Sequence, residues 1–296
     1  MSATFVPANG IQLCYETFGD PANPPLVLIM GLATQMIVWD DEFCAQLAAR
    51  GFWVVRFDNR DIGMSTRFPK ARTPSFAEMM LAQTTRIKFR VPYTLRDMAA
   101  DTAGLMDALG IRSAHIVGAS MGGAIAQEFA VLYPARARSL TSIMAPTGDP
   151  RLPGPRPRAL AALGKKVPLD RAGYVREYVA TWRVLAGEHF PFNAERTARQ
   201  GAAAYDRGIN PPGVARQMLA IIASGNRKKL QRAVKAPTLV IHGTADPLVP
   251  DEHGRATASA VPGARLLLIE GMGHSFPREV WPRIIDAIAA HAQENR

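Results

Sequence analysis

Short apolar runs that alternate with helical patterns constrain the fold of this chain more than any other feature. Runs at 26–30, 53–57 and 114–117 are mostly apolar, which is typical of strands buried on both faces. Before the third run, apolar residues recur at helical spacing over 95–109, where Thr94 and Asp97 are placed as a helix-capping pair. Strands alternating with helices predict a parallel sheet covered by helices on both faces.

The alternation stops over residues 147–235, which show only helical patterns broken by proline and glycine. Strand patterns return at 238–242 and 265–269, and a helical pattern closes the chain. We therefore expect an α/β core in two parts, residues 1–146 and 236–296, with 147–235 inserted as a helical cap. A TIM barrel is disfavoured, because it needs eight regular strand–helix units.

Composition indicates a globular protein rather than a disordered or fibrous one, since 48% of the 296 residues are hydrophobic and 20% charged. No apolar run approaches the roughly 20 residues that cross a bilayer, and the N-terminus has no signal-peptide pattern. We therefore expect a cytoplasmic protein without membrane insertion. Cys14 and Cys44 lie alone in apolar stretches, which predicts reduced core thiols and neither a disulfide scaffold nor a metal site.

The net charge of +10 is concentrated in one segment, because residues 147–235 hold 17 Lys and Arg against 6 Asp and Glu. Residues 227–229 form its one basic cluster, without interleaved aromatic residues, so we expect no nucleic-acid partner. Two interpretations stay open. The cap has a solvated basic face, or it attracts anionic substrates or membrane surfaces.

The sequence G-x-S-x-G at 118–122 lies between a predicted strand and a predicted helix. In a nucleophile elbow the serine has a strained backbone on a very tight turn, so its neighbours must be small. Ser120 is therefore the candidate nucleophile. A glycine-rich turn with an incidental serine is the alternative.

A serine nucleophile needs a base, and the base needs an acid that orients it. Asp246 and His274 follow the last two predicted strands, so both would lie at the same sheet edge as Ser120. The alternatives are a turn-forming aspartate and a loop or helix-capping histidine. Other candidates fit less well, because they fall in predicted strands, helices or the proline-rich exit into the cap: His115, His242, His253, His291, Asp149 and Asp251.

Acyl transfer also requires donors for the oxyanion, usually two backbone N–H groups. We expect one from Met121, at the start of the helix after Ser120, and the other from Leu32, in the loop after the first run.

These motifs together resemble the α/β-hydrolase-fold serine hydrolases along nearly the whole chain. Residues 57–65 are similar to the family pattern D-x-R-G-x-G-x-S, with Asp61 where glycine is usual, and Met30 precedes Gly31 where the family often has histidine. Residues 30–32, 39–43 and 271–274 look like the bacterial branch that contains aclacinomycin methylesterase. The resemblance implies a mostly parallel eight-stranded sheet with a helical cap after the sixth strand. Ser120 disfavours the relatives that use an aspartate or cysteine nucleophile.

The expected activity is hydrolysis of a small to medium, apolar carboxylic ester, methyl esters included, without cofactor or metal. The alternatives are a cofactor-free perhydrolase of haloperoxidase type and a ligand-binding receptor on a hydrolase scaffold. The sequence makes no prediction of oligomeric state. Side chains expected to wall the pocket are Trp182, Phe190, Phe192 and Met218, and at its entrance Phe76, Met79, Met80 and Leu81.

Overall fold

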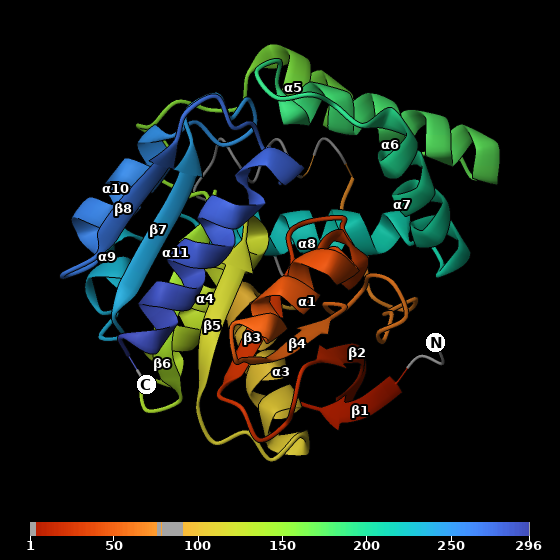
Figure 1. Ribbon diagram of the computed structural model, residues 1–296. Helices are drawn as coiled ribbons and strands as arrows, with labels where there is room; N and C mark the ends of the chain where they lie inside the picture. Colours follow the sequence, from red (N-terminus) through yellow and green to blue (C-terminus); the bar gives the residue numbers. More distant parts are fainter. Residues whose placement is uncertain (1–3, 76–77, 79–90, 296) are drawn as a thin grey trace.

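The computed structural model describes residues 4–75, 78 and 91–295, which build one eight-stranded sheet between two helical layers (Figure 1). The strands are β1 (Thr4–Ala8), β2 (Ile11–Phe18), β3 (Pro25–Ile29), β4 (Trp53–Phe57), β5 (Ala114–Ala119), β6 (Ala137–Ile143), β7 (Thr238–Gly243) and β8 (Arg265–Ile269). Their order is β1-β2-β4-β3-β5-β6-β7-β8, antiparallel at β1–β2 and β2–β4 and parallel elsewhere. The predicted mostly parallel sheet is confirmed. The expected entrance residues 76 and 79–81 lie outside the described residues.

Alternate side chains of the central strands pack into two separate hydrophobic cores, one on each face of the sheet. In β3, Leu26 and Leu28 pack with the helices at 41–49 and 281–293, whereas Val27 and Ile29 pack with those at 95–108 and 121–132. Both faces of β3 are therefore buried, which explains why residues 26–30 are all apolar. The helices around the sheet are α1 (Asp41–Ala49), α3 (Leu95–Ala108), α4 (Met121–Leu132), α10 (Glu252–Ala260) and α11 (Trp281–Gln293), with 3-10 turns η1 (Met36–Val38) and η2 (Arg278–Val280).

Helix α3 begins where the sequence predicts. The Thr94 hydroxyl accepts the N–H of Asp97, and the Asp97 carboxylate accepts the N–H of Thr94, which satisfies two N-terminal donors of the helix. Gly110 follows the helix with a φ of 68°, a conformation that glycine adopts without strain.

Between β6 and β7 the chain is helical, as predicted. The helices are α5 (Pro157–Leu163), α6 (Arg171–Ala186), α7 (Ala194–Asp206), α8 (Pro211–Ser224) and α9 (Lys228–Arg232). Helix α6 packs against α5 and α7, whereas α9 packs against α4 and α10 beside the sheet. Figure 1 shows α5 and α6 beyond the sheet edge to which β7 points. No helix among the described residues has the length and apolarity needed to cross a membrane.

Candidate active site

Ser120 lies between β5 and α4 with φ 55° and ψ −121°, a backbone conformation that residues other than glycine rarely adopt. The turn is tight on both sides. A Cβ at Gly118 would lie 2.1 Å from the carbonyl oxygen of Gly122, and one at Gly122 would lie 2.1 Å from that of Ile29. Glycine at both positions is therefore what permits the turn, for the reason anticipated from the sequence.

The structure brings Ser120, His274 and Asp246 together. His274 Nε2 lies 3.0 Å from Ser120 Oγ, and His274 Nδ1 lies 2.7 Å from Asp246 Oδ2. The histidine and the aspartate are buried. In this geometry the His274 Nδ1–H donates to the carboxylate, which leaves Nε2 to accept the proton of the serine hydroxyl.

Asp246 is held by its own loop. Its Oδ1 accepts the backbone N–H groups of Leu248 and Val249, each at 2.8 Å, which leaves Oδ2 for His274. The backbone N–H of His274 donates to the carbonyl of Leu185 at 2.7 Å, so the end of α6 fixes the histidine loop.

A second histidine, His242, lies beside the same carboxylate, which sequence reasoning missed. Its Nε2 is 2.7 Å from the carbonyl oxygen of Val249 and 3.7 Å from Asp246 Oδ2. Burial lowers the pKa of His242, although the charge of Asp246 opposes that effect. His242 is therefore neutral near pH 7 and donates from Nε2.

Three of the other candidates are held in hydrogen bonds of their own, although His253 and Asp149 also line the cavity that contains Ser120. His253 bonds Thr147 in the chain entering the helical segment, and Asp251 pairs with Arg255. Asp149 pairs with Arg151, whose hydrogen bonds hold the pKa of this carboxyl below its usual range.

The sequence predicts the backbone amides of Leu32 and Met121 as oxyanion donors. Among the described residues, no group accepts a hydrogen bond from the N–H of Leu32 or Met121, and both residues line the cavity at Ser120. A Cβ at Gly31 would lie 3.1 Å from that of Ser120, so the loop carrying Leu32 approaches the serine closely.

A cavity of about 930 Å³ opens onto Ser120 and His274, and most of its lining is apolar. The floor comes from loops after the strands, and the roof from the helical segment. Trp182 and Met218 line it, as expected from the sequence. Further apolar lining residues are Leu152, Val167, Val214, Ile221 and Leu248.

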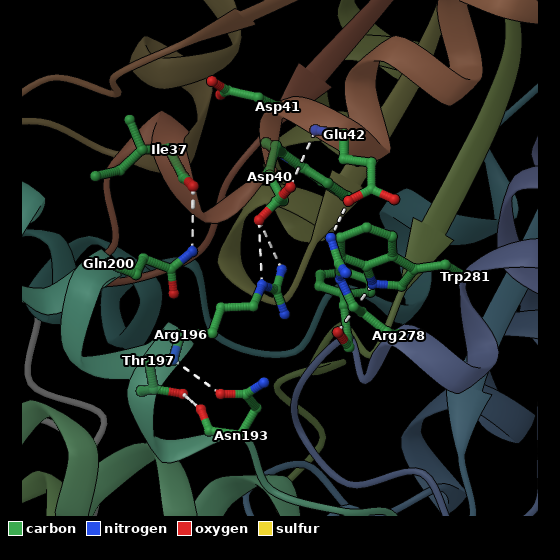
Figure 2. Close-up of polar contacts among 12 residues, drawn as sticks. Ile37, Asp40, Asp41, Glu42, Asn193, Arg196, Thr197, Gln200, Arg278 and Trp281 are labelled. Carbon is green, nitrogen blue, oxygen red and sulfur yellow. Dashed lines mark hydrogen bonds and ion pairs between the residues drawn. The ribbon is translucent and has the colours of Figure 1, made fainter.

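A second cavity of about 370 Å³ adjoins the first, and Phe190 and Phe192 line this one instead. Two arginines of its wall are paired with carboxylates, as Figure 2 shows. Arg196 binds Asp40 at 2.8 Å, and Arg278 binds Glu42. Both guanidinium groups also lie over the ring of Trp281, at 4.8 and 5.2 Å respectively.

The described residues contain no group of three or more His, Cys, Asp or Glu side chains that could hold a metal ion. Cys14 and Cys44 are buried, as predicted for core thiols.

Comparison with known proteins gives concordant results. Residues 24–277 match the family described as alpha/beta hydrolase fold. The chain is 32% identical to rhodomycin D methylesterase DnrP of Streptomyces peucetius, over 99% of both chains. It resembles the solved meta-cleavage product hydrolase CumD of Pseudomonas fluorescens IP01, with a TM-score of 0.78 at 19% identity over 99% of this chain and 98% of that one. An enol-lactonase from Burkholderia xenovorans LB400 aligns with a TM-score of 0.73 at 23% identity, over 98% and 100% of the chains.

Proposed function

The chain belongs to the α/β-hydrolase fold family, and from this premise we propose that it is a carboxylic ester hydrolase with Ser120 as its nucleophile. The observation that carries the proposal is the continuous chain of contacts from Ser120 Oγ through His274 to Asp246, at 3.0 and 2.7 Å. The similarity over full length to a methylesterase supports the same activity.

In the proposed mechanism Ser120 Oγ attacks the ester carbonyl while His274 Nε2 takes its proton. His274 then gives that proton to the leaving alcohol, and water repeats the sequence on the acyl-enzyme. Asp246 fixes the tautomer of the imidazole and stabilises the imidazolium that forms. The charge on the carbonyl oxygen is stabilised by the N–H groups of Leu32 and Met121, which need no reorganisation because no described residue accepts a hydrogen bond from them.

We propose a largely apolar small-molecule ester as the substrate. The apolar lining supports this, and about 930 Å³ lies toward the upper end of ligand-site volumes, so the cavity admits an ester of drug size. Residues 147–235 act as the cap, since they supply the roof of that cavity. The relative named a methylesterase favours a methyl ester, in which methanol leaves and the larger acyl part fills the cavity.

The test is labelling with a fluorophosphonate probe, followed by a turnover panel of methyl, p-nitrophenyl, lactone and thioester substrates. We expect labelling at Ser120, ester turnover by the wild type and none by a folded Ser120→Ala variant. Ser113→Ala is the matched control, because Ser113 bonds Arg138 and lies before β5 rather than after it.

Labelling of another serine, or turnover by Ser120→Ala, would refute the assignment. A wild type that binds esters without turning any over would favour the receptor alternative. Faster turnover with hydrogen peroxide as acceptor than with water would favour the perhydrolase.

A further inference from the structure

The loop that carries Leu32 is held by a side chain of the loop after β4 and by one of its own. Asn59 Nδ2 donates to the carbonyl of Met30 at 2.8 Å, and Thr34 Oγ1 donates to that of Gly31 at 2.9 Å. Further along, the Asp58 carboxylate accepts the N–H of Met36 at 2.8 Å. These bonds fix the two ends of the loop.

The middle of the loop is held from helix α8. The Ala33 N–H donates to Gln217 Oε1 at 3.3 Å, and Gln217 Nε2 donates to the carbonyl of Arg60 at 2.8 Å. Gln217 is fully buried, and it does not line the substrate cavity. Ala33 has a φ of 61°, in the left-handed region that alanine rarely adopts, so this conformation depends on the contacts around it.

Helix α8 is itself fixed against the core one residue earlier. Arg216 forms two hydrogen bonds of 2.8 Å with Asp61, and Asn210 donates to the carbonyl of Asp61 at 2.9 Å. Asp61 stands where the family pattern usually has glycine. Gln217 therefore lies on a helix whose position is fixed by the buried Arg216–Asp61 ion pair, and this places its side chain against the loop.

We propose that Gln217 is a positioning residue for the oxyanion hole: by accepting the N–H of Ala33, it orients the preceding Leu32 N–H toward the oxyanion. This rests on the proposed ester hydrolysis and extends it, since a residue of the cap then completes the catalytic geometry of the core. The two adjacent amides differ in their hydrogen bonds. The Ala33 N–H donates to Gln217, whereas no described residue accepts a hydrogen bond from the Leu32 N–H, which stays available to the substrate.

The experiment compares Gln217→Met with the wild type. Methionine has similar length but no acceptor for the Ala33 N–H, so we expect kcat to fall about 10- to 100-fold. KM should change less than about twofold, because Gln217 does not line the cavity and the lost contact acts mainly in the transition state. Affinity for a trifluoromethyl ketone, which forms an oxyanion on Ser120, should fall by the same factor as kcat.

Three further variants complete the design. Burial favours the protonated acid in Gln217→Glu, which can accept the Ala33 N–H and still donate to the Arg60 carbonyl, so this variant should retain more activity than Gln217→Met. Gln217→Asn is one methylene too short to reach Ala33. It replaces Gln217→Met if that variant does not fold, and the same fall in kcat is expected. Ser224→Ala removes a hydrogen bond within α8, from Ser224 Oγ to the Ala220 carbonyl, and should leave kcat unchanged.

Wild-type kcat and analogue affinity in a Gln217 variant that cannot reach Ala33 would overturn the proposal. Equal losses in Gln217→Glu and Gln217→Met would overturn it too, because they indicate only a general structural role. Failure of the proposed function is seen separately, as a wild type that turns over no ester.

Discussion

Arg216 and Asp61 form a two-point ion pair across the junction between helix α8 and the loop after β4, with both side chains at most 2% exposed. Two more arginines of the helical segment cross to core carboxylates, Arg207 to Asp58 and Arg196 to Asp40. Part of the positive charge of this segment is therefore used inside the molecule. Both interpretations of the sequence treated that charge as facing outward.

Breaking the pair from one side should be strongly destabilising. Arg216→Met leaves the Asp61 carboxylate buried without its cation, so we expect a loss of about 3–5 kcal/mol in the free energy of unfolding. Urea denaturation measures it. The double variant Asp61→Asn/Arg216→Met should lose less than Arg216→Met alone, since no charge is left buried.

The control for that measurement is Arg171→Met, which breaks an exposed ion pair with Asp206. Its unfolding midpoint should match the wild type, because solvent screens exposed pairs. Equal losses for the Arg216 and Arg171 variants would show that burial of the Asp61 pair does not matter.

The Asp246→Asn variant should show whether Asp246 acts as the catalytic acid or only forms a turn. Asparagine can still accept the Leu248 and Val249 amides, so the fold should persist, while kcat should fall by about 10⁴-fold as in the protease triad, through the wrong histidine tautomer. In a Ser120→Ala background the same substitution should add almost nothing, because the residues act as one unit. A stable Asp246→Asn variant with normal kcat would remove Asp246 from the site.

Gly122→Ala should destabilise the protein, although alanine usually stabilises a helix relative to glycine. The added Cβ would meet the Ile29 carbonyl oxygen at 2.1 Å, and we expect a loss of about 3 kcal/mol or more. Gly154→Ala is the control, since a Cβ there has no neighbour within 4 Å. A Gly122→Ala variant as stable as Gly154→Ala would mean that the elbow has more room than described.

Stability should fall as the pH drops below about 6.5. Burial lowers the pKa of His242 and of His291, so the unfolded chain takes up these protons before the folded one does. The stabilisation is complete above the unfolded pKa, near 6.5, and is lost toward the lower folded pKa, at up to about 1.4 kcal/mol per pH unit for each histidine.

Urea denaturation at pH 7.5 and 5.5 checks this expectation, with His242→Gln as the variant that removes one titrating group. The variant should lose less stability between the two pH values than the wild type does. An identical difference in both proteins would show that His242 does not contribute.

Much of the site follows from the sequence because parallel strands bring their carboxyl ends to one edge. That rule, with the elbow motif, places Ser120, Asp246 and His274 before any coordinates are known. Strands β1, β2 and β6 gave weaker signals. β1 is largely exposed, and β6 buries Ser139, Thr141 and Ser142, so neither gives a continuous apolar run.

The contacts of α8 are not visible in the sequence, because Arg216 and Gln217 are ordinary residues for a solvent-facing helix. Their burial depends on where the helix docks, which no local pattern determines. One signal was present in Asp61, since a carboxylate that replaces the usual glycine in a buried turn requires a cation nearby.

The docking of α8 also sets a rule for building chimeras of this protein. A foreign helical segment grafted between β6 and β7 without counterparts of Arg216 and Gln217 would leave Asp61 without its cation and the Ala33 amide without its acceptor. Such a graft would need the turn after β4 exchanged together with the helices. Chimeras made with this chain must therefore transfer these two segments together, although they lie about 150 residues apart in the chain.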